Sequence, residues 1–268
     1  MFTCEEFVLN PTMDARLIEP KHERPPQILP YHGDVRIYHP YYGDRLLSFA
    51  AHDTLPEEPG GVVYQIVKDA CYIIAKNENG FLAVDREGNN RVSGDPQLLK
   101  PGKYYYHLNS RVANYQVVAD FASWPFAAPI PAHWVRTDRT TKQYAQLCSR
   151  YAASSTEMSR VVKVNDAGCI ITNYVSCTCY RLLFMPSTPP FMLDAACENA
   201  HLVPLDQVDW FTVHSMDDYS LNPDAGINDV ANGVTLRSDV HACLNRHGFF
   251  FYPIGERRYL AYTVKRHE

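Results

Sequence analysis

The sequence lacks several features that would assign the protein to a special class. No apolar run approaches the roughly 20 residues that a membrane-spanning helix needs. The first residues do not combine a basic segment with an apolar core, so we expect no signal peptide and a cytoplasmic location, with the nucleus also open. A hydrophobic content of 46% over 268 residues instead indicates a globular protein with one large or two small domains.

An excess of positive charge is also missing. The chain has 25 Lys and Arg against 30 Asp and Glu, a net charge of −5. A protein that holds DNA by its phosphates needs a basic face. The composition therefore disfavours a nucleic-acid partner without excluding one, because an acidic protein can still carry a local basic patch. The longest basic clusters, 257–258 and 265–267, are expected on a solvated face.

Cysteine, by contrast, is frequent, with eight residues spread over the chain. Without a secretion signal, reduced thiols are expected. Cys71 and Cys148 lie on the apolar faces of predicted helices and are expected in the core. Four others could form a zinc site, although a spacing of one residue between two of them is poor for structural zinc. These four are Cys169, Cys177, Cys179 and Cys197.

The patterning predicts an α+β protein in four parts. These are an irregular arm over 1–30, an N-terminal half over 31–136, a linking helical segment over 137–160 and a C-terminal half over 161–268. Apolar residues at helical spacing predict a buried helix over 62–76, which Asn79-Gly80 would end. A small mixed sheet would pack on this helix. Its strands are expected at 34–38, 45–49, 81–84, 103–107 and 115–121.

Other segments are assigned from composition. The apolar, Pro-rich stretch 124–131 is expected to be a loop packed against the body. Helices are predicted over 137–154 and 205–214. The apolar insertion 181–194 contains three prolines, and it could line a pocket or cover the core.

The stretch 198–253 contains the main chemical motif, in which His201, Asn232 and His241 follow one another. We predict a β-hairpin followed by a helix, with His201 ending the first strand and His241 in the helix. Asn232-Gly233 is a strong turn dipeptide. Ser238 or Asp239 could cap the helix.

This order resembles the ββα-metal (HNH) nuclease motif, in the form found in fungal HNH-domain proteins. The resemblance extends to HGDVRIYHP at 32–40, LKPGKYYY at 99–106, WPF at 124–126 and GCIIT at 168–172, and so covers roughly residues 30–265. It implies an HNH-like ββα arrangement for the C-terminal half. It also implies roles: His201 is the general base, Asn232 fixes the hairpin loop and His241 binds the metal. Either histidine could instead be a hydrogen-bonded core residue.

The metal positions of the motif depart from this family. Ala200 precedes the first histidine where a ligand often stands, although alanine is not unusual there among the fungal relatives. Asn245 stands one turn after His241, where an Asp or His is usual. We therefore expect no bound metal. If a Mg²⁺ or Zn²⁺ site is retained, its ligands would be His241, Asn245 and Glu198, because Glu198 shares a strand face with Ala200.

Three functions follow from this sequence. The first is a metal-independent cyclisation or cycloaddition of a small molecule, Diels–Alderase-like, in fungal natural-product biosynthesis, with His201 as donor or acid/base. Arg237 and Trp210 would contact the substrate. The second is a metal-dependent HNH endonuclease acting on DNA or RNA, with His201 as general base. The third is a non-catalytic binding module.

Overall fold

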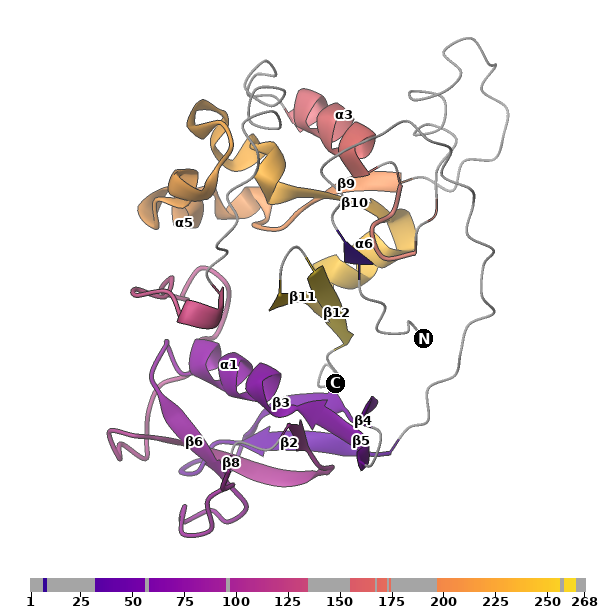
Figure 1. Ribbon diagram of the computed structural model, residues 1–268. Helices are drawn as coiled ribbons and strands as arrows, with labels where there is room; N and C mark the ends of the chain where they lie inside the picture. Colours follow the sequence, from indigo (N-terminus) through magenta and orange to yellow (C-terminus); the bar gives the residue numbers. More distant parts are fainter. Residues whose placement is uncertain are drawn as a thin grey trace.

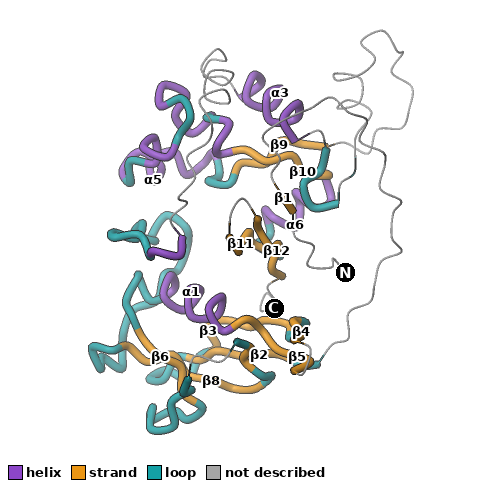
Figure 2. Tube along the Cα trace, in the orientation of Figure 1, coloured by secondary structure: helices purple, strands orange, loops and turns teal. Residues whose placement is uncertain are grey.

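The computed structural model describes residues 7–8, 32–55, 58–94, 97–134, 155–166, 168–172, 174, 197–255 and 258–263. The helix predicted over 137–154, the insertion 181–194 and residues Cys148, Cys177 and Cys179 lie outside this part of the chain. Figures 1 and 2 show the sheet of the N-terminal half at one end of the molecule and the strands and helices of the C-terminal half at the other. A C-terminal hairpin lies between them.

The N-terminal half is built on a four-stranded mixed sheet. Its strands are β3 (Arg45–Ala50), β2 (Asp34–Tyr38), β8 (Gly102–Leu108) and β6 (Gly80–Ala83), in that order. β2 and β8 run parallel, and the other two pairings are antiparallel. The predicted small mixed sheet and the strands at 34–38, 45–49, 81–84 and 103–107 are thus confirmed.

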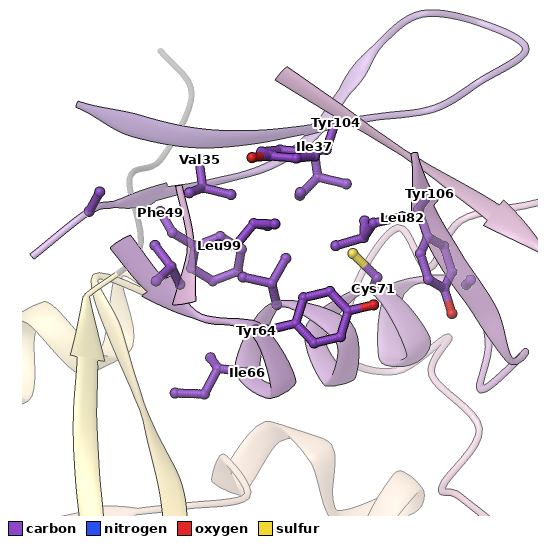
Figure 3. Packing of buried hydrophobic residues seen from close by; sticks show 14 of the residues in the cluster. Val35, Ile37, Phe49, Tyr64, Ile66, Cys71, Leu82, Leu99, Tyr104 and Tyr106 are labelled. Atoms are coloured by element: carbon purple, nitrogen blue, oxygen red, sulfur yellow. The ribbon is translucent and has the colours of Figure 1, made fainter. Parts of the chain in front are cut away.

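One helix, α1 (Tyr64–Ile74), covers the inner face of this sheet, as predicted. Val35, Ile37 and Tyr106 from the sheet pack against Ile66 and Cys71 of the helix (Figure 3). Cys71 is fully buried, which confirms it as a core residue. A smaller sheet of β4 (Asp53–Leu55), β5 (Glu58–Val63) and β7 (Leu98–Leu99) lies beside it.

Two local predictions in this half are wrong. Segment 115–121 contains no strand. Tyr115 is buried in the N-terminal cluster, and its hydroxyl donates to the carbonyl of Tyr106. Asn79-Gly80 does not end α1. The helix ends at Ile74, and Lys76 and Asn77 take the left-handed conformation after it, with φ of 55° and 64°. Gly80 is needed elsewhere, because an added Cβ would lie 2.2 Å from a backbone oxygen of β8.

The C-terminal half is organised around β9 (Cys197–His201) and β10 (Gly233–Arg237), which pair antiparallel. Two helices, α3 (Ser155–Asp166) and α6 (Ser238–Asn245), contact these strands. A long connection of short helices joins β9 to β10. It contains η2 (Leu205–Gln207), α5 (Val208–Val213), η3 (Met216–Tyr219), η4 (Pro223–Asn228) and η5 (Val230–Asn232). The predicted helix over 205–214 is therefore a 3-10 turn followed by α5.

The C-terminal hairpin of β11 (Phe249–Gly255) and β12 (Arg258–Thr263) joins the two hydrophobic clusters. Phe249 belongs to the cluster of the C-terminal half, whereas Tyr262 is buried in the N-terminal one. Tyr252 of β11 also donates a hydrogen bond to Asp69 of α1, at 2.8 Å. β1 (Phe7–Val8) pairs with the outer edge of β12.

A loop and a short helix at the end of the N-terminal half contact both α1 and the C-terminal half. Segment 124–131 has no helix or strand, as predicted, and η1 (Ala132–Trp134) follows it. Asp69 of α1 accepts hydrogen bonds from Trp134 and lies 2.8 Å from the His133 ring. Within the described residues, no helix has the length and apolar character that a membrane crossing requires.

Candidate functional site

His201 occupies the last position of β9, opposite Gly233 of β10. Its Nε2 atom is buried and has no hydrogen-bond partner within the described residues. Burial is the largest effect on His201 and lowers its pKa below the ordinary value of 6.5. A hydrogen bond with the Asn228 side chain raises this pKa, and electrostatic repulsion from His241 lowers it. His201 is therefore neutral at pH 7 and can accept a proton.

The second histidine is paired with a carboxylate. His241 of α6 places its Nδ1 atom 2.6 Å from Oε2 of Glu198 on β9. The His241 side chain is 20% exposed and that of Glu198 is 47% exposed, so the pair is open to solvent on one side. The His241 hydrogen bond lowers the pKa of Glu198, which is therefore a carboxylate at neutral pH. The alternation of β9 had indicated the face of Glu198 but not this direct contact.

Asn232 ties together the two ends of the connection between the strands. Its Oδ1 accepts from the Val203 amide at 2.7 Å, and its Nδ2 donates to the carbonyls of Val203 at 3.0 Å and Ile227 at 2.9 Å. The predicted tight Asn-Gly turn is wrong, because residues 202–232 separate the two strands and Gly233 has an extended φ of −124°. Asn232 instead closes a long loop beside His201.

Comparison with known proteins agrees with this arrangement. Residues 169–252 match the family model of the HNH endonucleases. On this similarity, we call residues 169–252 the HNH domain. The match includes His201, Asn232 and His241, together with β9, β10 and α6. No curated protein and no solved structure matches the chain.

The two aspartates near the HNH motif have structural roles. Asp229 is buried and accepts hydrogen bonds from the amides of Leu221, Asn222 and Ala231, at 2.8–3.1 Å. Asp239 does not cap α6 as predicted, and neither does Ser238, because both are already helical and Arg237 occupies the N-cap position without a side-chain cap. Neither aspartate is therefore free to complete the site.

Arg237 and Trp210, the predicted substrate contacts, are both engaged within the protein. The guanidinium of Arg237 forms a bidentate pair with Asp239, with both distances at 2.7 Å. Trp210 is 5% exposed, its ring stacks on Trp124 at 5.5 Å, and its Nε1 donates to the Trp124 carbonyl. Trp210 therefore packs the HNH domain against the loop of the N-terminal half, and a ligand of Arg237 would have to displace Asp239.

The side chains of the HNH domain restrict the metals that it could hold. Among the described residues, no three His, Cys, Asp or Glu side chains are grouped as a metal site. Glu198 and His241 offer two donors, and Asn245 is exposed at the end of α6. Two donors are too few for zinc, which takes four protein ligands in structural sites and normally three in catalytic ones. Two protein donors are compatible with Mg²⁺ or Mn²⁺, because these ions keep several waters as ligands and also bind substrate phosphates.

The cysteine group predicted as a zinc site is described only in part. Cys169 and Cys197 are both buried in the cluster of the C-terminal half. The thiol of Cys197 lies 3.6 Å from the carbonyl of Tyr174, to which it donates. The two described cysteines thus have packing and hydrogen-bonding roles beside β9.

Asp166, at the end of α3, supports the HNH strands from the side opposite α6. Its Oδ2 accepts from the Thr235 amide at 2.6 Å, and burial raises its pKa to about 6, above the ordinary 3.8. Because the folded state holds this proton to higher pH than the unfolded state does, the associated stability is fully present below pH 3.8 and is lost as the pH rises through about 6.

We therefore expect Asp166→Asn to stabilise the protein above pH 7. The amide oxygen can still accept from Thr235 but carries no charge to bury. The gain should be about 1–3 kcal/mol at pH 8 and close to zero at pH 4. Urea unfolding at both pH values measures it. A variant less stable than the wild type at pH 8 would show that the charged carboxylate is favourable in this position.

Proposed function

We propose that the HNH domain hydrolyses phosphodiester bonds of a nucleic acid, with His201 as general base and a divalent cation held by Glu198 and His241. The hydrogen-bonded pair of Glu198 and His241, near a neutral imidazole, is the observation that carries this proposal. A base and an anionic cation site next to one another are what metal-assisted hydrolysis requires.

His201 would act on water. A neutral imidazole has one nitrogen lone pair available for the proton of a water molecule. As water attacks phosphorus, His201 would take its proton, so that a hydroxide-like nucleophile forms only in the transition state. A divalent cation, when bound, supplies positive charge that stabilises the attacked phosphate and the leaving oxygen.

Metal-free cyclisation is less well supported than hydrolysis. That hypothesis rests on a scarcity of anionic donors around the two histidines, and Glu198, 2.6 Å from His241, is one such donor. The family match is to endonucleases and gives no support for a cyclase. The third hypothesis, a non-catalytic binding module, predicts instead that folded His201→Ala and His241→Ala variants keep the function of the wild type.

Cation binding gives the first test. We expect Glu198→Gln to weaken Mn²⁺ binding at least tenfold, because the amide can still bond to His241 but has no charge for the cation. Electron paramagnetic resonance of free Mn²⁺ measures this in the absence of DNA. Asp209→Asn, which removes an exposed carboxylate from α5, is the matched control and should bind as the wild type does. Equal Mn²⁺ affinity in Glu198→Gln and the wild type would refute the proposed cation site.

The pH dependence of cleavage gives a second test. Only neutral His201 can accept a proton, so kcat/KM should fall as the pH decreases through the pKa of His201. Because that pKa is lowered, the midpoint of the fall should lie below 6.5. Glu198, whose pKa is also lowered from 4.5, stays ionised over this range. A midpoint above 6.5 would be inconsistent with a buried His201 as the base.

A further inference from the structure

The outer face of the four-stranded sheet carries an unusual set of side chains. Strand residues alternate between two faces, and Val35, Ile37, Tyr104, Tyr106 and Leu82 point into the core. The residues between them therefore point outward. Together with an arginine beside β6, they form what we call the sheet platform: Arg36, Tyr38, Phe81, Arg91, Lys103 and His107.

The strand pairing brings the platform residues together from distant parts of the sequence. In the parallel pair β2–β8, Arg36 lies opposite Lys103, and Tyr38 lies opposite Tyr105. In the antiparallel pair β6–β8, Phe81 lies opposite His107. The platform thus has a basic pair, then Tyr38 beside the buried Tyr105, then a Phe-His pair, and these succeed one another along β8 at intervals of roughly 6.6 Å.

Cations of the platform are held over its rings. The Lys103 ammonium lies 4.4 Å from the centroid of Tyr38, and the Arg91 guanidinium lies 3.6 Å from that of Phe81. Phe81 in turn stacks on His107, with 5.3 Å between the ring centroids and 13° between the planes. These contacts hold the cations in place near the surface, where Arg36, Arg91 and Lys103 are exposed.

The three cations have no ion pair with a carboxylate within the described residues. Asp85 and Glu87 lie near His107 and mark the acidic border of the platform. On a chain with a net charge of −5, an exposed group of three unpaired cations is a local exception. Such a group is complementary to a polyanion.

We propose that the sheet platform binds single-stranded nucleic acid. Basic side chains can pair with its phosphates, and the exposed Arg91 guanidinium and the partly exposed Tyr38 ring offer flat faces on which unpaired bases stack. A duplex presents phosphates but hides its base faces, so the rings favour a single strand. The link to cleavage rests on the proposed function, and the binding itself does not.

The platform would hold the strand away from the candidate active site. In Figures 1 and 2, the outer face of the sheet lies at the end of the molecule opposite β9, β10 and α6. A long strand could reach both sites, whereas a short oligonucleotide could not. Loss of the platform should therefore raise KM for long single strands and leave kcat and the cleavage of short oligonucleotides unchanged.

Binding is tested by fluorescence anisotropy with a labelled 30-nucleotide single strand in EDTA, which removes any contribution from a cation. We expect the double variant Arg36→Ala/Lys103→Ala to bind more than tenfold more weakly, and its salt slope to be smaller by about 1.4, which corresponds to two lost phosphate contacts. Tyr38→Ala should weaken binding about five- to hundredfold through lost stacking. Arg160→Ala, an exposed arginine on α3, is the control and should bind as the wild type does.

Circular dichroism and thermal unfolding establish that each variant is folded. The proposal is overturned if folded platform variants bind the single strand as the wild type does, or if a duplex of the same length binds as tightly. Glu198→Gln separates the two proposals, because it should bind the single strand normally in EDTA. If the wild type binds the single strand through the platform but never cleaves it, the binding proposal is retained and the proposed hydrolysis is refuted.

Discussion

His201→Ala is expected to lower the rate of cation-dependent phosphodiester cleavage by about 10²–10⁴-fold, the usual contribution of a general base. The alanine variant removes the only buried, unpartnered imidazole nitrogen next to the Glu198–His241 pair within the described residues. Single-turnover cleavage of an end-labelled strand at saturating protein measures the chemical step without contributions from binding.

Two comparisons make this result specific. His247→Ala removes an exposed imidazole just after α6 and should cleave at the wild-type rate. Mn²⁺ binding to His201→Ala should be normal, because Glu198 and His241 are retained. A His201→Ala variant that is folded and cleaves within threefold of the wild type would remove His201 from the mechanism.

Asn232→Ala is expected to reduce the free energy of unfolding by about 2–4 kcal/mol. The change would leave three backbone groups without their side-chain partner: the buried carbonyl of Ile227 and the partly buried amide and carbonyl of Val203. Each unpaired buried group costs about 1–3 kcal/mol, and partial relaxation reduces the sum. Chemical denaturation in EDTA measures the loss.

The control for this substitution is Asn245→Ala. Asn245 is exposed at the end of α6, and its loss should change stability by less than about 0.5 kcal/mol. Because Asn232 closes the loop that follows His201, the destabilised variant should also lose cleavage activity. Equal stability of Asn232→Ala and the wild type would mean that the loop is held by other contacts.

Regular elements of the N-terminal half were predictable because each has a strong local period. Val35 and Ile37 alternate with Arg36 and Tyr38, and the apolar positions of α1 recur at helical spacing. The strand predicted from Tyr115 onward is absent. Tyrosine is frequent in strands, but here it is buried in a loop, and the sequence does not distinguish the two cases. Burial comes from tertiary packing there and leaves no periodic signal.

The C-terminal site shows a different limit of sequence analysis. The dipeptide Asn232-Gly233 favours a tight turn locally, but the long connection and its hydrogen bonds to Asn232 override that preference. Strand alternation indicated the face of Glu198, whereas the distance from β9 to α6 depends on helix packing. For this reason the sequence indicated Glu198 as a candidate ligand but did not predict its contact with His241.

The sheet platform was hidden for a related reason. Arg36 and Lys103 are far apart in the chain, and only the parallel register of β2 and β8 places them opposite each other. The net charge of −5 sums all residues and does not reveal a local basic group, so the composition alone disfavoured a nucleic-acid partner. The three-dimensional arrangement of charge, and not its sum, decides which anions a surface attracts.

Cleavage of a long, end-labelled single strand by the full chain tests the central proposal most directly. The reaction is run in EDTA, in Mg²⁺ and in Mn²⁺, with the wild type, His201→Ala and His241→Ala. We predict cleavage by the wild type in Mg²⁺ or Mn²⁺, none in EDTA, and a rate at least about a hundredfold lower for both variants. Cleavage that is equal in EDTA and in Mg²⁺, or a wild type that binds the strand but cleaves it with neither cation, would contradict the proposed hydrolysis.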